Sequence, residues 1–417
     1  MTEIPRSSTP AEVVIVGGGV AALEAMMALR ELAGERVSIT LVAPDDDFVY
    51  RPLAVVDPFG GGEPRRYPLG RIVADFGARH VRVHVEAVDA PGRRVIGAGG
   101  TTLGYDTLIL APGARTLPAF DAAIEFGRPN SNAAMRELLA DLRRKEVRRV
   151  GFVAPTVAGW TLPLYELALL TARTIAENGI DAELFLITPE RRPLAAFGTG
   201  PSALVANLLR EAGVEFIGST FPVVEPDAVL LDPQHRRLAV DRTVALPLIR
   251  GPRLDGVPAQ TEYGFIPVDR HGRVAGMEHV YAAGDATAFP IKQGGLAAQQ
   301  ADAVAHHVAA RYGAAVNPAP FTPVLRGMLF TGGPARFLTA GLTRGAAEGS
   351  ASSQALWWPP TKIAGRYLSP YLLERDRAEA EALDRPPKGF ESVEIALDDM
   401  QREQGAIDWA GGSSAPR

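Results

Sequence analysis

The stretch 12–22 reads EVVIVGGGVAA, an apolar strand that runs through glycines straight into a helix. Gly17 permits a tight turn after the strand, Gly19 lets backbone approach a pyrophosphate, and Ala22 lets the helix pack closely on the sheet. After the helix, a second apolar strand reads VSITLV at 37–42. A strand, a helix and a parallel strand within about 30 residues form a dinucleotide-binding unit.

The start of the predicted helix, at Val20, completes the phosphate site, because free N–H groups at the positive end of a helix bind phosphate oxygens. An acidic residue normally ends the second strand and binds the ribose. Here the strand ends at Pro44 without one, and Asp45, Asp46 and Asp47 follow. Two interpretations stay open: Asp45 or a neighbour reaches the ribose, or the three aspartates form a solvated turn.

The whole chain has the composition of a globular protein of two or three domains. It has 417 residues, 47% hydrophobic and 22% charged, with a net charge of −5. This charge excludes recruitment of nucleic acid by bulk electrostatics. The chain has no cysteine, which excludes disulfides, thiolate metal sites and a redox-active dithiol. We find no signal peptide and no apolar run long enough to span a bilayer, so we expect a cytoplasmic protein.

No metal site is predicted from the histidines. His80 and His84 fall on one face of a strand-like run, 80–88, which we interpret as a solvated strand face. His306 and His307 are adjacent on a predicted helix and point apart, so they cannot form a ligand pair.

A second strand–helix–strand unit spans 149–188. Its loop, 154–161, has a single glycine, Gly159, and Pro155 removes an N–H donor. Side chains at the other loop positions block the close approach of a pyrophosphate. The sequence therefore predicts a dinucleotide-like domain that binds NADH or NADPH poorly.

A short apolar strand at 280–283 ends in Gly284-Asp285. This segment resembles the Gly-Asp motif of the pyridine nucleotide–disulfide reductase superfamily. The resemblance implies that Asp285 accepts hydrogen bonds from the ribitol of FAD and that Gly284 gives the cofactor room. We expect the FAD to be noncovalent, because the chain has no cysteine and no motif for another attachment.

Other segments complete the expected FAD site. The helix that opens at Gly294-Gly295 would stabilise reduced flavin with its positive end. Lys292, just before it, has either the same role or that of an ordinary surface lysine. The turn 111–113 resembles the superfamily's Ala-Thr-Gly turn, with proline as a departure, and Arg51-Pro52 falls where the superfamily sends a helix toward the flavin. The predicted cofactor-binding residues are Gly17, Gly19, Val20, Ala22, Asp45, Arg51, Pro52, Ala111, Pro112, Gly113, Gly284, Asp285, Lys292, Gly295 and Leu296.

These segments predict an α/β fold with two Rossmann-like dinucleotide-binding domains and a C-terminal domain. The FAD-binding domain is discontinuous, at 12–116 and 246–311, and an NAD(P)-like domain at 117–245 is inserted into it. We expect a C-terminal interface domain at 318–390 and a flexible tail at 391–417.

The stretch 162–168, LPLYELA, gives a finer resemblance. It is similar to the Gly-Pro-Ala-Tyr-Glu stretch of sulfide:quinone oxidoreductases and flavocytochrome c sulfide dehydrogenase flavoproteins, a branch near the type II NADH dehydrogenases. When Pro163, Tyr165 and Glu166 are aligned with it, Trp160 takes the place of a redox cysteine, which excludes cysteine-based sulfide chemistry. Trp160 is either a core residue or a wall over the flavin. No side chain can be recognised as a general base from the sequence. Trp160 and Lys292 are the candidate catalytic residues.

The resembling branch uses its C-terminal region for membrane-surface attachment and a quinone pocket. Here that region has an aromatic and basic cluster, which either meets a membrane interface or makes a domain or subunit contact such as a homodimer. We favour the domain or subunit contact. The members of the cluster are Leu356, Trp357, Trp358, Lys362, Arg366, Tyr367, Leu368, Tyr371, Leu372 and Leu373.

Three functions fit these features. The leading one is an FAD-dependent oxidoreductase in which an organic donor reduces FAD and a quinone or another small acceptor reoxidises it. The second is an NAD(P)H:acceptor reductase with a divergent nucleotide loop. The third is a flavin-binding interaction or redox-sensing protein with little turnover. The sequence names neither the donor nor the acceptor.

Overall fold

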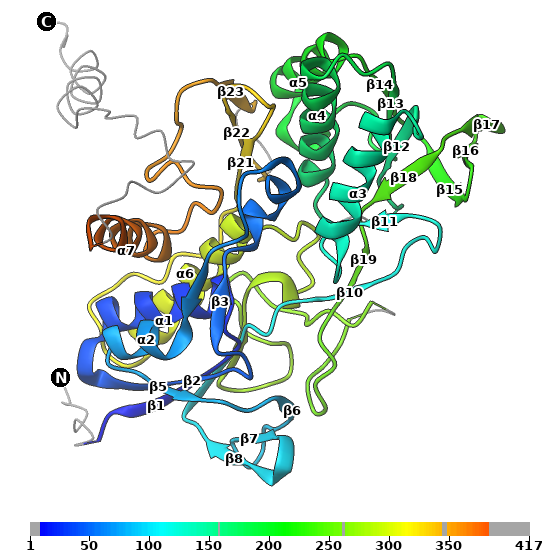
Figure 1. Cartoon of the computed structure of the whole chain (residues 1–417). Helices are drawn as coiled ribbons and strands as arrows, with labels where there is room; N and C mark the ends of the chain where they lie inside the picture. The colour runs from blue at the N-terminus through cyan, green and yellow to red at the C-terminus, as the bar shows by residue number, and fades with distance from the viewer. Residues whose placement is uncertain (1–8, 157–158, 261–262, 344–347, 383–417) are drawn as a thin grey trace, which may run out of the picture. The chain divides into compact units, whose positions relative to one another are not determined.

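The computed structural model describes residues 9–156, 159–260, 263–343 and 348–382, and it has two five-stranded sheets flanked by helices (Figure 1). The chain divides into a unit of residues 1–372, which contains both sheets, and a unit of residues 373–417. The predicted α/β class is confirmed.

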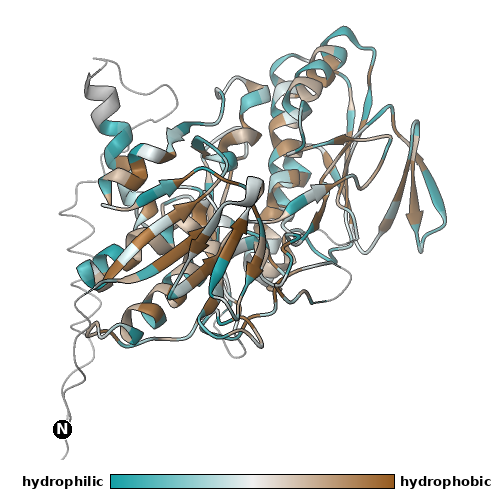
Figure 2. Cartoon of the chain, turned by 90° about the horizontal axis from the view of Figure 1, so that it is seen from below, coloured by the Kyte–Doolittle hydropathy of each residue, from teal (hydrophilic) through white to brown (hydrophobic). Residues whose placement is uncertain are grey.

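The first sheet is parallel throughout, in the order β20-β9-β1-β2-β5. Its strands are β1 (Ala11–Val16), β2 (Val37–Val42), β5 (Arg79–Val81), β9 (Thr107–Leu110) and β20 (Val280–Ala282). Helices α1 (Val20–Ala33) and α6 (Gly294–Arg311) pack side by side along one of its faces. Alanines on both helices permit this close packing. Continuous apolar strands, brown in Figure 2, are typical of a sheet that is buried on both faces.

The second sheet is again parallel, in the order β11-β18-β12-β13-β14. Its strands are β11 (Ile124–Glu125), β12 (Arg149–Val153), β13 (Glu183–Ile187), β14 (Val214–Ile217) and β18 (Arg242–Ala245). Its helices are α3 (Ser131–Arg144), α4 (Leu162–Glu177) and α5 (Thr199–Glu211). The second predicted strand–helix–strand unit is therefore present.

The two sheets are joined by a short antiparallel ladder. Strand β10 (Arg115–Leu117) leaves the first sheet toward the second, and β19 (Leu248–Arg250) pairs with it on the way back. We propose that the boundaries between the two dinucleotide-type domains, after residues 116 and 245, lie at this ladder.

Smaller elements surround the sheets. They are β3 (Asp47–Val49), β4 (Arg66–Pro68), α2 (Leu69–Asp75), β6 (Val85–Asp89), β7 (Arg94–Gly97), β8 (Thr102–Gly104), β15 (Phe221–Glu225), β16 (Ala228–Asp232) and β17 (Arg236–Ala239), with short 3-10 helices that include η2 (Arg51–Val55), η3 (Asp57–Phe59), η5 (Ala195–Phe197) and η6 (Gly284–Ala286). The prediction of one strand at 80–88 is wrong: β5 ends at Val81 and β6 begins at Val85, so His84 lies in the turn between them.

The C-terminal strands form a third, antiparallel sheet. It consists of β21 (Val324–Leu329), β22 (Arg336–Gly341) and β23 (Ser350–Ser352), in that order. Leu325, Leu329 and Leu338 are buried in the same core as α4. Helix α7 (Leu368–Ala382) follows. The expected tail at 391–417 and the last residues of the expected C-terminal domain lie outside the described residues.

In the ranges given above, no group of three or more histidine and acidic side chains could hold a metal ion. No helix in the described part of the chain combines the length and apolarity needed to cross a bilayer.

A buried aspartate ties the segment that follows Arg51 to helix α3. Asp57, in η3, accepts hydrogen bonds from the side chains of Arg136 (3.0 and 3.1 Å) and Asn132 (2.5 Å) on α3. We predict that Asp57→Ala lowers the free energy of unfolding by about 1–3 kcal/mol, since it removes the carboxylate that accepts the hydrogen bonds from Asn132 and Arg136. Urea unfolding measures this. Asp121→Ala, at an exposed site, is the control and should change stability by less than about 0.5 kcal/mol. Equal losses in the two variants would contradict the prediction.

Candidate active site

The first glycine loop is built around one close contact. Gly17 has φ +126°, and a Cβ at this position would lie 2.1 Å from the carbonyl oxygen of Ala111. The loop and the turn that begins at Ala111 therefore touch, which only glycine permits. Gly19 differs: it has φ −95°, and a Cβ there would meet nothing within 4 Å. This open space lies beside the first N–H groups of α1, where a pyrophosphate fits.

Gly284 brings the start of η6 against helix α1, which follows the first glycine loop. Gly284 has φ +77°, and a Cβ there would lie 2.9 Å from the Cβ of Ala21 on α1. Its N–H donates to Gln300 of α6 at 2.8 Å. The next residue, Asp285, is therefore held at the start of α1, beside the expected cofactor. Val20 and the fully buried Ala22 lie on the same helix.

Asp285 is a half-buried carboxylate with free acceptor capacity. It makes no hydrogen bond or ion pair with any residue that the structure describes. Burial raises the pKa of Asp285, and the positive charges of Lys292 and Arg51 oppose this shift. A carboxylate in this state can accept hydrogen bonds from ribitol hydroxyls.

Lys292 is a buried residue, which excludes the surface interpretation. Its ammonium donates to the carbonyls of Thr287 (2.5 Å) and Phe289 (2.6 Å) and lies 3.7 Å from the ring centroid of Phe265. Burial lowers the pKa of Lys292 to about 8, although Asp285 opposes the shift. Two of its three N–H donors hold its own loop, so at most one is left for a ligand.

The same lysine joins the flavin segment to the second domain. Its main-chain N–H donates to the carbonyl of Gly159 at 2.9 Å. A Cβ on Gly159 would lie 2.8 Å from the Cγ of Lys292. The only glycine in that divergent loop is therefore needed for contact with Lys292 rather than for a nucleotide.

The start of α6 is capped by its own side chain. Gln293 accepts a hydrogen bond from the N–H of Leu296 at 2.8 Å, and its amide donates to the carbonyl of Arg326 at 3.0 Å. A Cβ on Gly294 would lie 2.9 Å from Ile363, so the C-terminal segment covers this helix end. Gly295 and Leu296 thus lie where C-terminal residues and the flavin segment meet. The N–H of Leu296 donates to Gln293, so this N–H is not available to a flavin.

The remaining predicted contacts lie after β2 and β9. Asp46 pairs with Arg82 at 2.9 Å and Asp47 approaches Arg66 at 3.9 Å. Asp45 is exposed and has no ion pair among the described residues, so it stays a candidate for the ribose. Arg51 and Pro52 begin η2, with Arg51 exposed. Pro112 and Gly113 (φ +77°) form the turn after β9.

Residues of the second domain contact one another near the ends of β12 and β13. Glu190, after β13, accepts hydrogen bonds from the hydroxyl of Tyr165 (2.7 Å) and the N–H of Ala195 (3.2 Å). Burial raises the pKa of Glu190. Trp160 packs on Phe197 with 5.9 Å between ring centroids, so its core interpretation is supported.

Strand β21 packs against the same part of the second domain. A Cβ on Gly327 would lie 2.7 Å from the ring of Phe197 and 2.8 Å from Leu162. The loop before α4 and the loop after β13 are thus bridged by apolar side chains at the place where a dinucleotide would lie.

Sequence reasoning missed a buried ion pair. Glu166 on α4 is fully buried and pairs with Lys362, whose side chain is 7% exposed. The N–H of Phe330 also donates to Glu166 at 2.8 Å, whereas Oε2 of Glu166 has no partner among the described residues. Burial raises the pKa of Glu166 and lowers that of Lys362, and their mutual attraction opposes both shifts. A glutamate inside an apolar helical run was the signal for such a partner.

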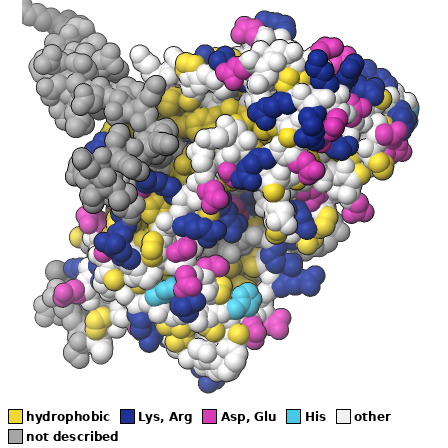
Figure 3. Space-filling view, in the orientation of Figure 1, with side chains coloured by type: hydrophobic (Ala, Val, Ile, Leu, Met, Phe, Trp, Pro, Cys, Tyr) yellow, Lys and Arg dark blue, Asp and Glu magenta, His cyan; other side chains and the backbone are white. Residues whose placement is uncertain are grey.

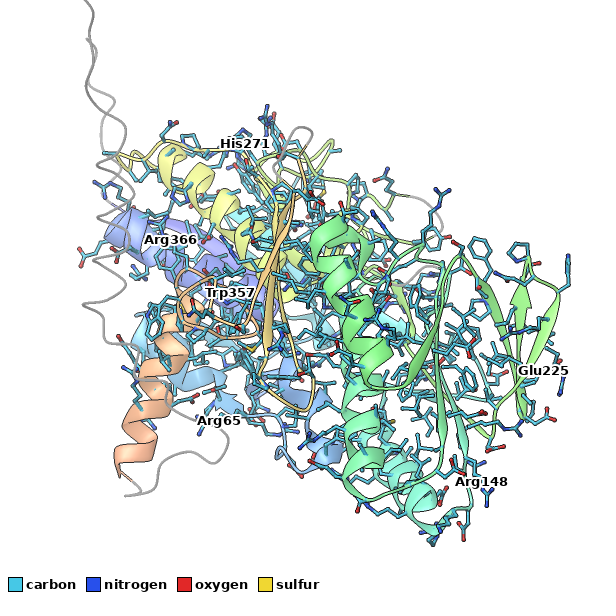
Figure 4. The ribbon with its side chains drawn as sticks, turned by 90° about the horizontal axis from the view of Figure 1, so that it is seen from above. Arg65, Arg148, Glu225, His271, Trp357 and Arg366 are labelled. Carbon is cyan, nitrogen blue, oxygen red and sulfur yellow. The ribbon has the colours of Figure 1, made fainter. Side chains whose placement is uncertain are left out.

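Part of the expected aromatic and basic cluster is buried within the chain. Lys362, Leu368 and Leu372 are buried, and Trp357 donates to the carbonyl of Thr361 at 2.9 Å. Figure 4 shows Trp357 and Arg366 on the C-terminal segment. Within unit 1, the large apolar members that stay exposed are Leu356 (40%) and Trp358 (49%). Packing within the chain therefore buries part of the cluster, and Leu356, Trp358 and Arg366 stay exposed.

Comparisons with known proteins agree with this arrangement. A family model described as pyridine nucleotide-disulphide oxidoreductase matches residues 11–310. An NADH dehydrogenase-like protein of Mycobacterium tuberculosis (strain CDC 1551 / Oshkosh) is 28% identical over 66% of this chain and 72% of its own length. The sulfide-quinone reductase of Aquifex aeolicus (strain VF5) is 24% identical over 71% of this chain and 75% of its own. Among solved structures, the sulfide:quinone oxidoreductase from the hyperthermophilic bacterium Aquifex aeolicus has a TM-score of 0.73 at 20% identity, covering 82% of this chain and 86% of that chain.

The two glycines of the first loop should separate folding from cofactor binding. Gly17→Ala places a Cβ against the Ala111 carbonyl at a φ that alanine rarely adopts, so we predict a lower thermal midpoint together with loss of FAD. Gly19→Ala meets open space, so we predict a nearly unchanged apoprotein midpoint but FAD affinity weakened by roughly tenfold or more, as expected when about two charge-assisted hydrogen bonds are impaired. Thermal unfolding and FAD titration test both. Full FAD affinity in Gly19→Ala would place the pyrophosphate elsewhere.

Proposed function

The chain belongs to the pyridine nucleotide-disulphide oxidoreductase family, and from this premise we propose that it is an FAD-dependent oxidoreductase whose electron donor is an organic molecule other than NADH or NADPH. The proposed acceptor is a quinone or another small molecule. The contacts of Trp160, Phe197 and Glu190 within the second domain are the observations that support this choice of donor.

The first domain supplies the residues for noncovalent FAD. The N–H groups at Gly19 and Val20 would bind the pyrophosphate, and Asp285 would accept the ribitol hydroxyls. Arg51 and Lys292 place positive charge near Asp285. When bound, FAD supplies two-electron chemistry, and the protein provides position and electrostatics. No cysteine exists for a covalent link or for sulfur chemistry.

The second domain argues against a pyridine nucleotide. A ribose-binding acid is expected after β13, and the acid there, Glu190, is already bonded to Tyr165 and Ala195. A pyrophosphate at the loop before α4 would lack the donor that Pro155 removes. Binding would also require Trp160 and Phe197 to separate.

The buried Glu166–Lys362 pair can exchange a proton between its own two groups. The pair lies beside the segment that covers the start of α6. Burial brings the two pKa values toward each other, which eases transfer of a proton between the groups.

Leu356 and Trp358 support a peripheral contact. They are exposed and apolar on the same short segment, and Arg366 is exposed nearby in the sequence. Such a group fits a partner subunit or the surface of a membrane. We keep the subunit contact as the favoured proposal.

Asp285 offers a direct test of the flavin site. Asp285→Ala removes the acceptor for the ribitol, and loss of a hydrogen bond to a charged group costs about 1.5–3 kcal/mol, so FAD affinity should fall by about tenfold to a hundredfold. The exposed Asp255→Ala is the control and should retain wild-type affinity. FAD content after dialysis measures both. A flavin-saturated Asp285→Ala protein would show that the ribitol lies elsewhere.

Anaerobic bleaching at about 450 nm tests the choice of donor. A pyrophosphate that loses two charged hydrogen bonds, each worth about 1.5–3 kcal/mol, shifts a micromolar dissociation constant toward millimolar. We therefore predict slow bleaching by NADH and NADPH that does not saturate in the micromolar range, whereas dithionite, the control, bleaches the flavin fully. Rapid saturating bleaching would instead support the NAD(P)H:acceptor reductase, the alternative that the NADH dehydrogenase-like relative favours.

A further inference from the structure

A partly buried arginine on β21 has no partner. The guanidinium of Arg326 makes no hydrogen bond or ion pair with the residues that the structure describes. Burial alone lowers the pKa of Arg326, and no carboxylate opposes the shift. Most desolvated arginines have an acidic partner, because an unpaired buried charge is costly.

Two hydroxyl groups stand in register with this arginine. Arg326 pairs across the sheet with Thr339, and Thr339 pairs with Ser350. Side chains directly opposite each other share a face, with Cβ atoms about 5 Å apart. Neither hydroxyl is hydrogen-bonded to a described residue. We call Arg326, Thr339 and Ser350 the polar row.

The polar row faces away from the core of the second domain. Leu325 and Leu329, the alternate residues of β21, are buried in that core. Strand side chains alternate between faces, so Arg326 lies on the other side. There the next pair across the sheet is Met328 and Phe337.

An aromatic wall adjoins the polar row. Trp357 stands edge-on to Phe337 with 5.1 Å between ring centroids. Hydrophobic side chains gather over the part of the molecule where Figure 1 draws β21 to β23 (Figure 3). The carbonyl of Arg326 accepts the hydrogen bond from Gln293, so this strand is tied to the start of α6.

We propose that the polar row binds the carboxylate of a small organic acid whose apolar body lies against Met328, Phe337 and Trp357. A guanidinium can donate two parallel hydrogen bonds to a carboxylate, and the hydroxyls can donate to the same oxygens. A single cation beside an apolar wall suits a monoanion with an apolar body better than it suits phosphate. The role of this acid as an electron donor or acceptor rests on the proposed function, but its binding does not.

Benzoate is the probe. We titrate it into the full FAD-loaded chain and follow tryptophan fluorescence and binding heat. We expect saturable binding that Arg326→Gln weakens by at least about tenfold and Thr339→Val by a few fold. Arg336→Gln is the matched control, since Arg336 lies in the same sheet and donates only to main-chain carbonyls. It should bind benzoate like the wild type. Benzamide, which has no charge, should bind the wild type at least about tenfold more weakly.

Several results would overturn the proposal: no benzoate binding to the wild type, wild-type affinity in Arg326→Gln, equal binding of benzamide, or tighter binding of inorganic phosphate than of benzoate. The wild-type comparison of benzoate with benzamide decides the matter if Arg326→Gln does not fold. Flavin absorbance is recorded in the same samples. A yellow protein that ignores benzoate refutes this inference alone, and a colourless one that binds benzoate refutes the proposed function alone.

Discussion

The contact between Gly17 and the Ala111 carbonyl is the constraint on which the first domain depends. It forces the loop after β1 against the turn after β9, and it leaves the neighbouring Gly19 facing open space. The approach of Gly284 to Ala21 then brings a segment from far along the chain to the same helix start. Open space beside Gly19 and the carboxylate of Asp285, which has no hydrogen-bond partner among the described residues, thus both lie at the start of α1, which is the arrangement that a dinucleotide cofactor needs.

The second domain has the same kind of five-stranded parallel sheet as the first, but its loop lacks the run of glycines found at 17–19. Its loop has one glycine, and Gly159 serves the contact with Lys292. Trp160 packs on Phe197, Gly327 of β21 lies against the Phe197 ring, and Glu190 is hydrogen-bonded within the domain. The domain then positions other groups, including Glu166, whose burial is tolerated because Lys362 pairs with it.

Features set by local pattern could be predicted from the sequence. The helix at Gly294 and both strand–helix–strand units follow from apolar periodicity and glycine placement, and they lie within a few residues of the expected bounds. Features set by distant packing could not. Lys362 has the sequence surroundings of a surface cation. Packing of the C-terminal segment against α4 nevertheless buries it. The hydrogen bond from Gln293 to Arg326 and the register of Arg326 with Thr339 likewise depend on the position of β21. The residues around Gln293 and around Thr339 do not specify that position.

The most direct test of the central claim is the absorption spectrum of the purified protein, followed by acid precipitation. We expect flavin bands near 370 and 450 nm (approximate positions for oxidised flavin) at close to one FAD per chain, with the yellow colour released into the acid supernatant because no side chain holds the cofactor covalently. A protein that has no flavin bands and cannot be reconstituted with FAD, or colour that stays in the precipitate, would contradict it.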